Sequence, residues 1–291
     1  MTLANNVALN GGNLTATGSN DITLGGTVSG ANGLVQSGTG TLTLSGNNNY
    51  SGGTTLTSGT LAANSNTALG TGAVNVTGAA NLTAADGVTL ANNVTLANAL
   101  TATGAGNWTL AGNLTGAGSL VKEGSGTLTL TGANGYTGGT QLNAGGLTGN
   151  TGSLQGNVAT AAGTTLTFNQ NTNGTYGGNL SGAGNLEKAG TGTVTLDGAN
   201  TLTGAIGVAQ GTLRAGGGAI NTASGVRIDS GATLALTSAA SIASLTGAGT
   251  LQSGSALTLG NGSDSIFGGV LAGTGSTTKV GTGTLTLAGA N

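Results

Sequence analysis

GANGLVQSGTGTLTLSGNNNYSGGTTLTSGTL, residues 30–61, is the stretch that decides the fold, because it returns along the chain with its spacing kept. Residues 116–147 read GAGSLVKEGSGTLTLTGANGYTGGTQLNAGGL, and residues 182–213 read GAGNLEKAGTGTVTLDGANTLTGAIGVAQGTL. A shortened copy covers residues 247–271, and a last copy covers residues 273–291. Self-similarity of this kind is typical of repeat architectures, in which each unit packs on its neighbours.

Apolar residues recur at matching positions of the copies and alternate with Thr, Ser, Gly or Asn. An alternation with period two predicts strands that bury one face. The side chains expected to form the core of the repeat are Leu34, Leu42, Leu44, Leu120, Leu128, Leu130, Leu186, Val194, Leu196, Leu285 and Leu287.

The composition limits which fold classes and which functions are expected. The chain has 62 Gly, no Pro, Cys or His, 36% apolar residues, and only 4% charged residues, where soluble domains have about 25%. So much Gly, Thr and Asn makes helices weak, and we expect essentially none. Five Lys and Arg cannot neutralise many phosphates, so nucleic acid is not an expected partner. No apolar run approaches the ~20 residues of a membrane-spanning helix, and no cofactor is expected.

Three architectures accommodate many short strands: a sandwich, a propeller and a parallel β-helix. The copies start at Gly30, Gly116, Gly182, Gly247 and Gly273, and a closed ring of equal blades would not accept such unequal steps. If the repeating unit is one rung of roughly 20–24 residues, the unequal steps correspond to different whole numbers of rungs. We therefore predict an all-β solenoid of roughly 13 rungs, continuous over residues 1–291, with both ends cut within repeats. Asn at recurrent turn positions is expected to form hydrogen-bonded ladders.

The string GxGTLTLSGxNxYSGGTTLxSGTL resembles the passenger-associated repeat of bacterial autotransporters, the proteins of type V secretion. It is carried by residues 38–61, 124–147, 190–213 and, incompletely, 281–291. The resemblance implies a right-handed parallel β-helix on the outer surface of a Gram-negative bacterium. It also implies export through a C-terminal β-barrel translocator, which would be the segment's partner, and a role in secretion or in the stalk of a surface adhesin. Such a segment is not expected to insert into the membrane.

Two copies depart from the repeat. The third has Leu202 where the others have Tyr, and LTGAI where the second has YTGGT. The copy that begins at Gly247 lacks two residues before its Leu-Thr-Leu. We expect a bulge or a loop in these rungs.

Catalysis by a β-helix, as in polysaccharide lyases and hydrolases, needs clustered carboxylates. Here the acidic residues are spread along the chain, and without His or Cys the usual nucleophile–base pairs and transition-metal sites are nearly excluded. The local clusters are Asp229 near Arg227, and Asp264 within GNGSDS, which weakly suggests a calcium turn. The seven acids are Asp21, Asp86, Glu123, Glu187, Asp197, Asp229 and Asp264. We therefore expect no enzyme and no metal site.

Lys122, Lys188 and Lys279 occupy one repeat position. They could form a charged strip for a partner, but a solvated turn that keeps the protein soluble is the favoured interpretation. The aromatic residues could stack on sugars or pack against turns, and packing is favoured for Tyr50 and Tyr136, which precede Gly-Gly pairs.

The function expected from the sequence is a structural stalk or passenger segment. An adhesive module that binds host or bacterial surface glycans, or a second copy of itself, is the alternative. A lyase or hydrolase is the remote one.

Overall fold

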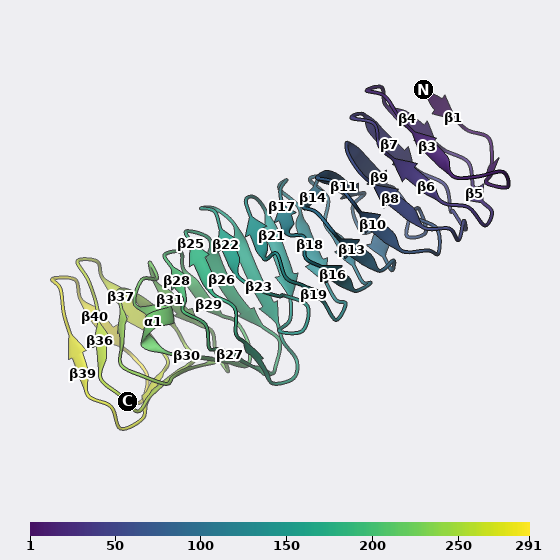
Figure 1. The fold of residues 1–291 in the computed structure, drawn as a ribbon. Coiled ribbons are helices and arrows are strands. Elements are labelled where there is room, and N and C mark those ends of the chain that lie inside the picture. Colours follow the sequence, from purple (N-terminus) through teal and green to yellow (C-terminus); the bar gives the residue numbers. More distant parts are fainter. The chain divides into compact units, whose positions relative to one another are not determined.

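A computed structural model describes residues 1–291, and the chain divides into two compact units. Unit 1 comprises Met1–Leu147 and Gly152–Gly156, and unit 2 comprises Thr148–Thr151 and Asn157–Asn291. In both units short strands follow one another around a coil, and each strand pairs in parallel with the strand one rung further on (Figure 1). The two units together hold about 14 rungs and are 1% helical. The predicted all-β parallel solenoid is thereby confirmed, while its right-handed sense stays a prediction.

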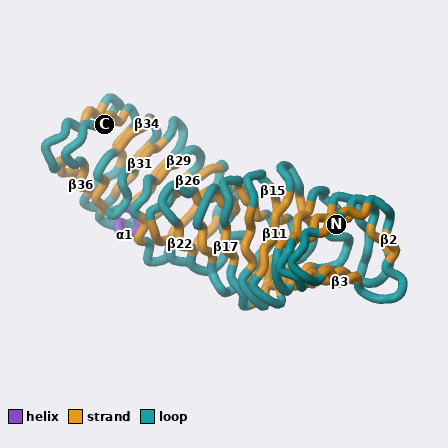
Figure 2. The backbone as a smooth tube through the Cα atoms, turned by 90° about the horizontal axis from the view of Figure 1, so that it is seen from above, coloured by secondary structure: helices purple, strands orange, loops and turns teal.

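The sheets of unit 1 run along its successive rungs, with short strands joined by loops (Figure 2). One sheet contains β1 (Thr2–Leu3), β4 (Ile22–Leu24), β7 (Thr41–Leu44), β9 (Thr60–Ala63), β11 (Ala80–Ala84), β14 (Leu100–Thr103), β17 (Leu120–Lys122) and β20 (Thr140–Leu142). A second contains β3 (Leu14–Ala16), β6 (Leu34–Gln36), β8 (Thr54–Leu56), β10 (Val74–Val76), β13 (Val94–Leu96), β16 (Leu114–Gly116) and β19 (Gly135–Tyr136). The remaining pairings join β2 (Val7–Ala8) to β5 (Val28–Ser29), and β12 (Thr89–Leu90) to β15 (Trp108–Leu110) and β18 (Thr127–Leu130). β21 (Gly146–Gly149) has residues in both units.

Unit 2 is built in the same way. One sheet contains β23 (Thr165–Asn169), β26 (Asn185–Ala189), β29 (Ile206–Val208), β31 (Val226–Ile228), β34 (Leu245–Gly247), β37 (Ser265–Phe267) and β40 (Leu285–Leu287). A second contains β24 (Gly174–Tyr176), β27 (Thr193–Leu196), β30 (Thr212–Ala215), β32 (Thr233–Leu236), β35 (Thr250–Ser253) and β38 (Val270–Ala272). The other strands are β22 (Val158–Thr160), β25 (Leu180–Gly182) and β28 (Thr201–Leu202), and then β33 (Ala240–Ile242), β36 (Leu257–Leu259) and β39 (Thr277–Lys279).

Strand register sets the length of a rung. Val74 pairs with Thr54 on one side and with Val94 on the other, and this regular step lies at the short end of the predicted range. Matching sequence positions therefore stack directly above one another, and apolar side chains form continuous interior columns. Burial of one Leu side chain contributes roughly 1.5–3 kcal/mol, which makes these columns the main source of stability.

The predicted core residues lie in these columns, except at the last strand of one sheet. Leu285 is half-buried, and Leu287 is 39% exposed, both on the edge strand β40. The buried members of the predicted set are Leu34, Leu42, Leu44, Leu120, Leu128, Leu130, Leu186, Val194 and Leu196.

The two departures from the repeat have different structural outcomes. After Leu202, which is buried in β28, the next rung carries the short helix α1 (Gly217–Ile220) between β28 and β33. The copy that begins at Gly247 forms a shorter rung instead, because Thr233 pairs with Thr250 and the chain between them is shorter than in a regular rung. Both rungs stay in parallel register with their neighbours, so the unit tolerates a missing or helical segment between its strands.

Asn side chains at the predicted turn positions bond to main-chain groups of neighbouring rungs. Asn48 Oδ1 accepts a hydrogen bond from Val28 N at 2.8 Å, and its Nδ2 donates to Ala68 O at 2.6 Å. This side chain therefore joins three successive rungs from a position that is 3% exposed. Asn134, Asn200 and Asn291 occupy the same repeat position and accept from the main-chain N–H of Leu114, Leu180 and Leu271, respectively.

The tyrosines of the first two copies pack inside unit 1. Tyr50 OH lies 2.6 Å from Thr54 Oγ1, and Tyr136 OH lies 2.7 Å from Thr140 Oγ1, with both rings buried. In the third copy the corresponding buried pair is Leu202 with Ile206. Both members of the pair thus change from polar to apolar together, which avoids an unpaired hydroxyl in the core.

Alkaline pH should unfold unit 1 through these tyrosines. Burial raises the pKa of Tyr50 to about 12 from an ordinary value of 10, and also raises the pKa of Tyr136. A folded-state pKa above the unfolded value gives stability that is complete below pH 10 and is lost as pH rises toward 12. Absorbance of ionised tyrosine and urea unfolding, followed from pH 8 to 12.5, test this.

The matched variant carries the third copy's pair, Tyr50→Leu with Thr54→Ile. We expect it to keep its fold and to lose less stability between pH 10 and 12 than the wild type does. Ionisation of Tyr50 near pH 10 in the folded chain would contradict the account.

Candidate functional site

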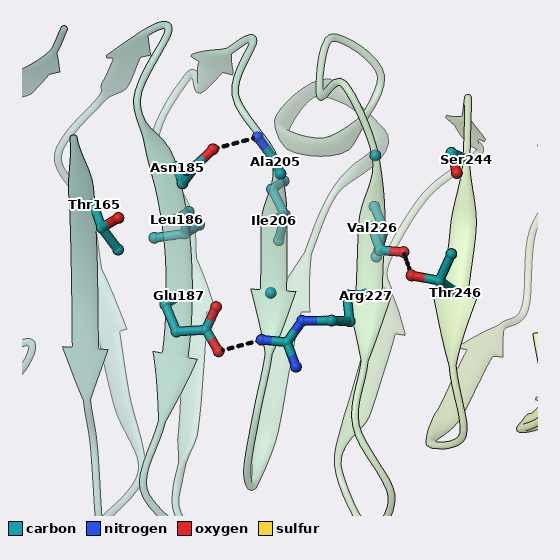
Figure 3. A pocket seen from close by; sticks show the side chains of 12 residues that line it. Thr165, Asn185, Leu186, Glu187, Ala205, Ile206, Val226, Arg227, Ser244 and Thr246 are labelled. Carbon is teal, nitrogen blue, oxygen red and sulfur yellow. Dashed lines mark hydrogen bonds and ion pairs between the residues drawn. The ribbon is translucent and has the colours of Figure 1, made fainter. Parts of the chain in front are cut away.

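Charged side chains gather on the outer face of one sheet of unit 2, over β26, β29 and β31 (Figure 3). Strand register places Glu187 beside Gly207, and Gly207 beside Arg227. The glutamate and the arginine are therefore two rungs apart, with a residue that has no side chain between them. This spacing lets their long side chains meet across the glycine.

The guanidinium of Arg227 holds two carboxylates. Its Nη2 lies 2.9 Å from Glu187 Oε1, and its Nη1 donates to Asp229 Oδ2. The hydrogen bond to Asp229 and the charge of Glu187 raise the pKa of Arg227. All three side chains remain partly exposed to solvent. Exposed ion pairs contribute little to stability, typically about 0–1 kcal/mol.

Gly207 creates a concavity at this cluster. The hollow has a volume of ≈ 320 Å³ and lies over Ala205, Gly207 and Gly225. A Cβ at Gly207 would collide with Glu187 Oε2 and would lie 3.1 Å from Arg227 Nη2. The glycine therefore leaves room for the hollow and for the ion pair in its present geometry.

The polar groups around the hollow are mostly engaged. Asn185 Oδ1 accepts a hydrogen bond from Ala205 N at 2.9 Å, and Thr246 Oγ1 donates to Val226 O at 3.5 Å. Both carboxylates are paired with Arg227, so neither is arranged as a free general base or nucleophile.

Three of the other five acidic residues fix turns between rungs. Asp21, Asp86 and Asp264 each accept a hydrogen bond through Oδ1 from a main-chain N–H one rung further on. For Asp264, in the suspected calcium turn, the donor is Thr284 at 2.6 Å. Nowhere do three acidic side chains come together as a metal ion would need.

A second concavity, of ≈ 460 Å³, lies between β27 and α1. It is lined largely by Gly, Ala and Thr, with Asp197 as its acidic residue. A single carboxylate in an open hollow provides no catalytic pair.

The favoured interpretation of the repeated lysines as solvated is wrong for two of the three. Lys122 is 1% exposed and Lys188 is 0% exposed, so neither lies on a solvated turn. In β17 the side chains of Leu120, Val121 and Lys122 alternate, so Lys122 faces the interior as Leu120 does. Lys188 has the equivalent place in β26. Lys279, on the edge strand β39, is exposed.

The aromatic residues are also inside the units. Phe168 and Tyr176 make an edge-to-face contact with their ring centroids 5.0 Å apart. The expected packing of Tyr50 and Tyr136 is confirmed, and a surface platform for stacking on sugars is contradicted. The buried aromatic residues are Tyr50, Trp108, Tyr136, Phe168, Tyr176 and Phe267.

Sequence reasoning paired Arg227 with Asp229 but missed Glu187 and Gly207. Glu187 lies far from Arg227 along the chain, and only the regular step from rung to rung makes that separation meaningful. The available signal was that Gly207 falls midway between the two opposite charges.

Replacing Gly207 by Ala should push the Glu187 carboxylate away from Arg227 and make the hollow shallower. We expect a loss of less than about 1 kcal/mol at low salt, because the pair is exposed. The stability of the wild type should fall with added salt more than that of the variant. Thermal unfolding at low and high salt measures this.

Gly177→Ala is the matched control, since a Cβ there meets nothing within 4 Å. The role given to Gly207 fails if Gly207→Ala and the control show the same stability and the same salt dependence.

Comparison with known proteins found one family. The passenger-associated-transport-repeat matches residues 34–63, 120–148, 186–215 and 278–291. No curated protein and no solved structure gave a significant match. The structure contains no helix with the length and apolar character needed to cross a membrane. The repeat family implies a secreted, surface-exposed passenger and suggests a structural, non-catalytic domain. The repeats predicted from the sequence are thus confirmed, and the chain has the repeat content and β-solenoid fold of an autotransporter passenger domain.

Proposed function

We propose that this chain is a structural stalk or passenger segment of a surface-exposed autotransporter adhesin, and that its rung-by-rung folding supports secretion and display. Its partner in secretion would be a C-terminal β-barrel translocator. The segment would stand outside the outer membrane of a Gram-negative bacterium, either anchored or released.

The observation that carries the proposal is the interior Asn of the repeat. Asn134 Oδ1 accepts from Leu114 N at 2.7 Å, and its Nδ2 donates to Ser153 O at 2.7 Å. A folded rung therefore leaves donors and acceptors that the next rung completes. Each added rung also covers the apolar column of the one before it. Folding outside the cell can then favour outward movement of the chain without a chemical energy source.

An adhesive module is the second candidate, and the hollow over Gly207 is the observation that favours it. Amide, hydroxyl and guanidinium groups around it can form hydrogen bonds with a sugar or with a second copy of the chain. Against it, the aromatic side chains that commonly stack on sugars are buried. A lyase or hydrolase has less support still, because Arg227 engages both carboxylates of the cluster.

Display on the cell surface tests the stalk proposal. The chain is placed between an export signal and an autotransporter β-barrel, and its exposure is measured with an external protease and antibody. Leu130→Asp puts a charge at a position that is 1% exposed, so the rung should not close and display should fall severalfold. Thr129→Asp, on the outward side of the same strand β18, should display near the wild-type level. Equal display of both variants would overturn the proposal.

A further inference from the structure

The repeat position shared by Lys122 and Lys188 holds a buried cation without a carboxylate partner. Both lysines occupy core-facing positions of their strands. Lys122 stacks between Ala102 and Leu142. Lys188 stacks between Phe168 and Val208. The aliphatic stem thus continues an apolar column, while the ammonium group must find its partners elsewhere.

Those partners are main-chain carbonyls of two rungs. Lys122 Nζ donates to Glu123 O at 2.9 Å and to Gly124 O at 2.8 Å, both in its own turn. It also donates to Ala144 O at 3.3 Å, in the turn of the next rung.

Lys188 repeats this geometry in unit 2. Its Nζ donates to Ala189 O at 2.7 Å, to Gly190 O at 2.7 Å and to Gln210 O, one rung on, at 3.0 Å. Three donors meet three acceptors, which is the full capacity of an ammonium group. Burial lowers the pKa of both amines, while the carbonyl contacts favour the charged form.

A glycine in the next rung lets the third carbonyl approach. Gly145 follows Ala144, Gly211 follows Gln210, and both glycines have a φ of 67°. A side chain at either glycine would be strained and would also collide with carbonyls of the preceding turn. The arrangement therefore depends on a lysine in one rung and on a glycine in the turn of the following rung.

The first copy has a different solution at the same position. Gln36 Nε2 donates to Gly38 O at 3.1 Å and to Gly40 O at 2.9 Å. Ser58 corresponds to Ala144 and Gln210, and its single O–H is shared between Ser37 O at 2.7 Å and Gly38 O at 3.1 Å. The amide oxygen Oε1 of Gln36 is buried and has no hydrogen-bond partner. Gln and Ser together thus replace the donors of one lysine, but they leave one acceptor unsatisfied.

Lys279 shows the same side chain without a rung stacked over it. On the edge strand β39, its Nζ donates to Val280 O at 2.7 Å and to Gly281 O at 3.1 Å, and it is exposed. Lys279 thus makes the same two contacts within its own turn as Lys122 and Lys188 do, but it makes no contact to a next rung.

We infer that Lys122 and Lys188 are ammonium clasps, each of which binds the turn of its own rung to the turn of the next. The inference concerns the folded chain alone and does not depend on the proposed role in secretion. A covered clasp is a buried charge that is satisfied only by the correct neighbour in the correct register. The clasp thereby favours one register of rung on rung.

Native-state hydrogen exchange of the full chain tests the clasp. Lys188→Met removes the lysine's donor from three carbonyls, of which Ala189 O keeps its bond from Gln170 N, so the amide of Ala209, bonded to Lys188 O, should exchange at least about tenfold faster. Lys122→Met should do the same at Asn143, which is bonded to Lys122 O. Lys279→Met removes the same charge at the same repeat position and should change neither rate. Equal, small effects of all three substitutions would overturn the inference.

A reciprocal exchange separates the clasp from simple loss of charge. Lys122→Gln should speed exchange at Asn143, and adding Ala144→Ser should restore part of the protection, because Gln36 and Ser58 show that this pair fits. Gln36→Lys with Ser58→Ala should slow exchange at Thr57, whose N–H is bonded to Gln36 O. No rescue by Ala144→Ser, together with no gain at Thr57, would contradict the assignment.

Amine acylation of the wild-type chain gives a test that needs no variant. Lys279 and the N-terminus should react readily, whereas Lys122 and Lys188 should stay unmodified until the chain unfolds. Acylation of the two buried lysines at the rate of Lys279 would refute the clasp even if the substituted chains failed to fold.

Discussion

The structure depends on one constraint, which is that a rung cannot satisfy all of its interior polar groups by itself and needs the rungs before and after it. Within the sheets, parallel main-chain hydrogen bonds meet this requirement. At the corners between sheets they do not suffice, and there Asn, Asp and Lys side chains provide donors or acceptors to the neighbouring rung. Because unpaired buried polar groups cost about 1–3 kcal/mol each, these corner contacts restrict the rungs to one register.

The repeat copies vary in contacting pairs rather than in single positions. The Tyr–Thr pair of two copies becomes Leu202 with Ile206 in the third. The lysine clasp becomes Gln36 with Ser58 in the first. In each case the partner lies either within the same rung or one rung on. Such paired changes explain how the copies differ in sequence and still stack in parallel register.

Much of the fold follows from the sequence because stacking enforces a strict period. The alternation in TLTL fixes which side chains face inward, and the spacing of the copies fixes the approximate rung length. The shorter rung before Thr250 and the helix α1 could not be derived in detail. Loops between strands accept changes in length as long as the strands on either side keep their register.

Sequence reasoning failed where a residue's partners are main-chain atoms or lie several rungs away. A lone Lys among Gly, Ser and Thr is usually solvated, and nothing in its immediate neighbourhood shows that carbonyls surround Lys122. The informative pattern was longer: Gly124 and Gly126 follow that lysine, Gly145 comes in the next rung, and Lys188 repeats the series. Gly207 needed the register as well, because only stacked rungs place it between Glu187 and Arg227.

Hydrogen exchange of Asn134→Ala tests most directly whether side chains at the corners join the rungs. Asn134 accepts from Leu114 N and donates to Ser153 O, so its loss removes both contacts and leaves the buried Leu114 N–H without its acceptor. Asn98→Ala, at an exposed residue that bonds only to the adjacent Ala99, is the control. The account predicts that Leu114 and its rung exchange at least about tenfold faster in Asn134→Ala than in the control. Equal exchange in the two variants would contradict it.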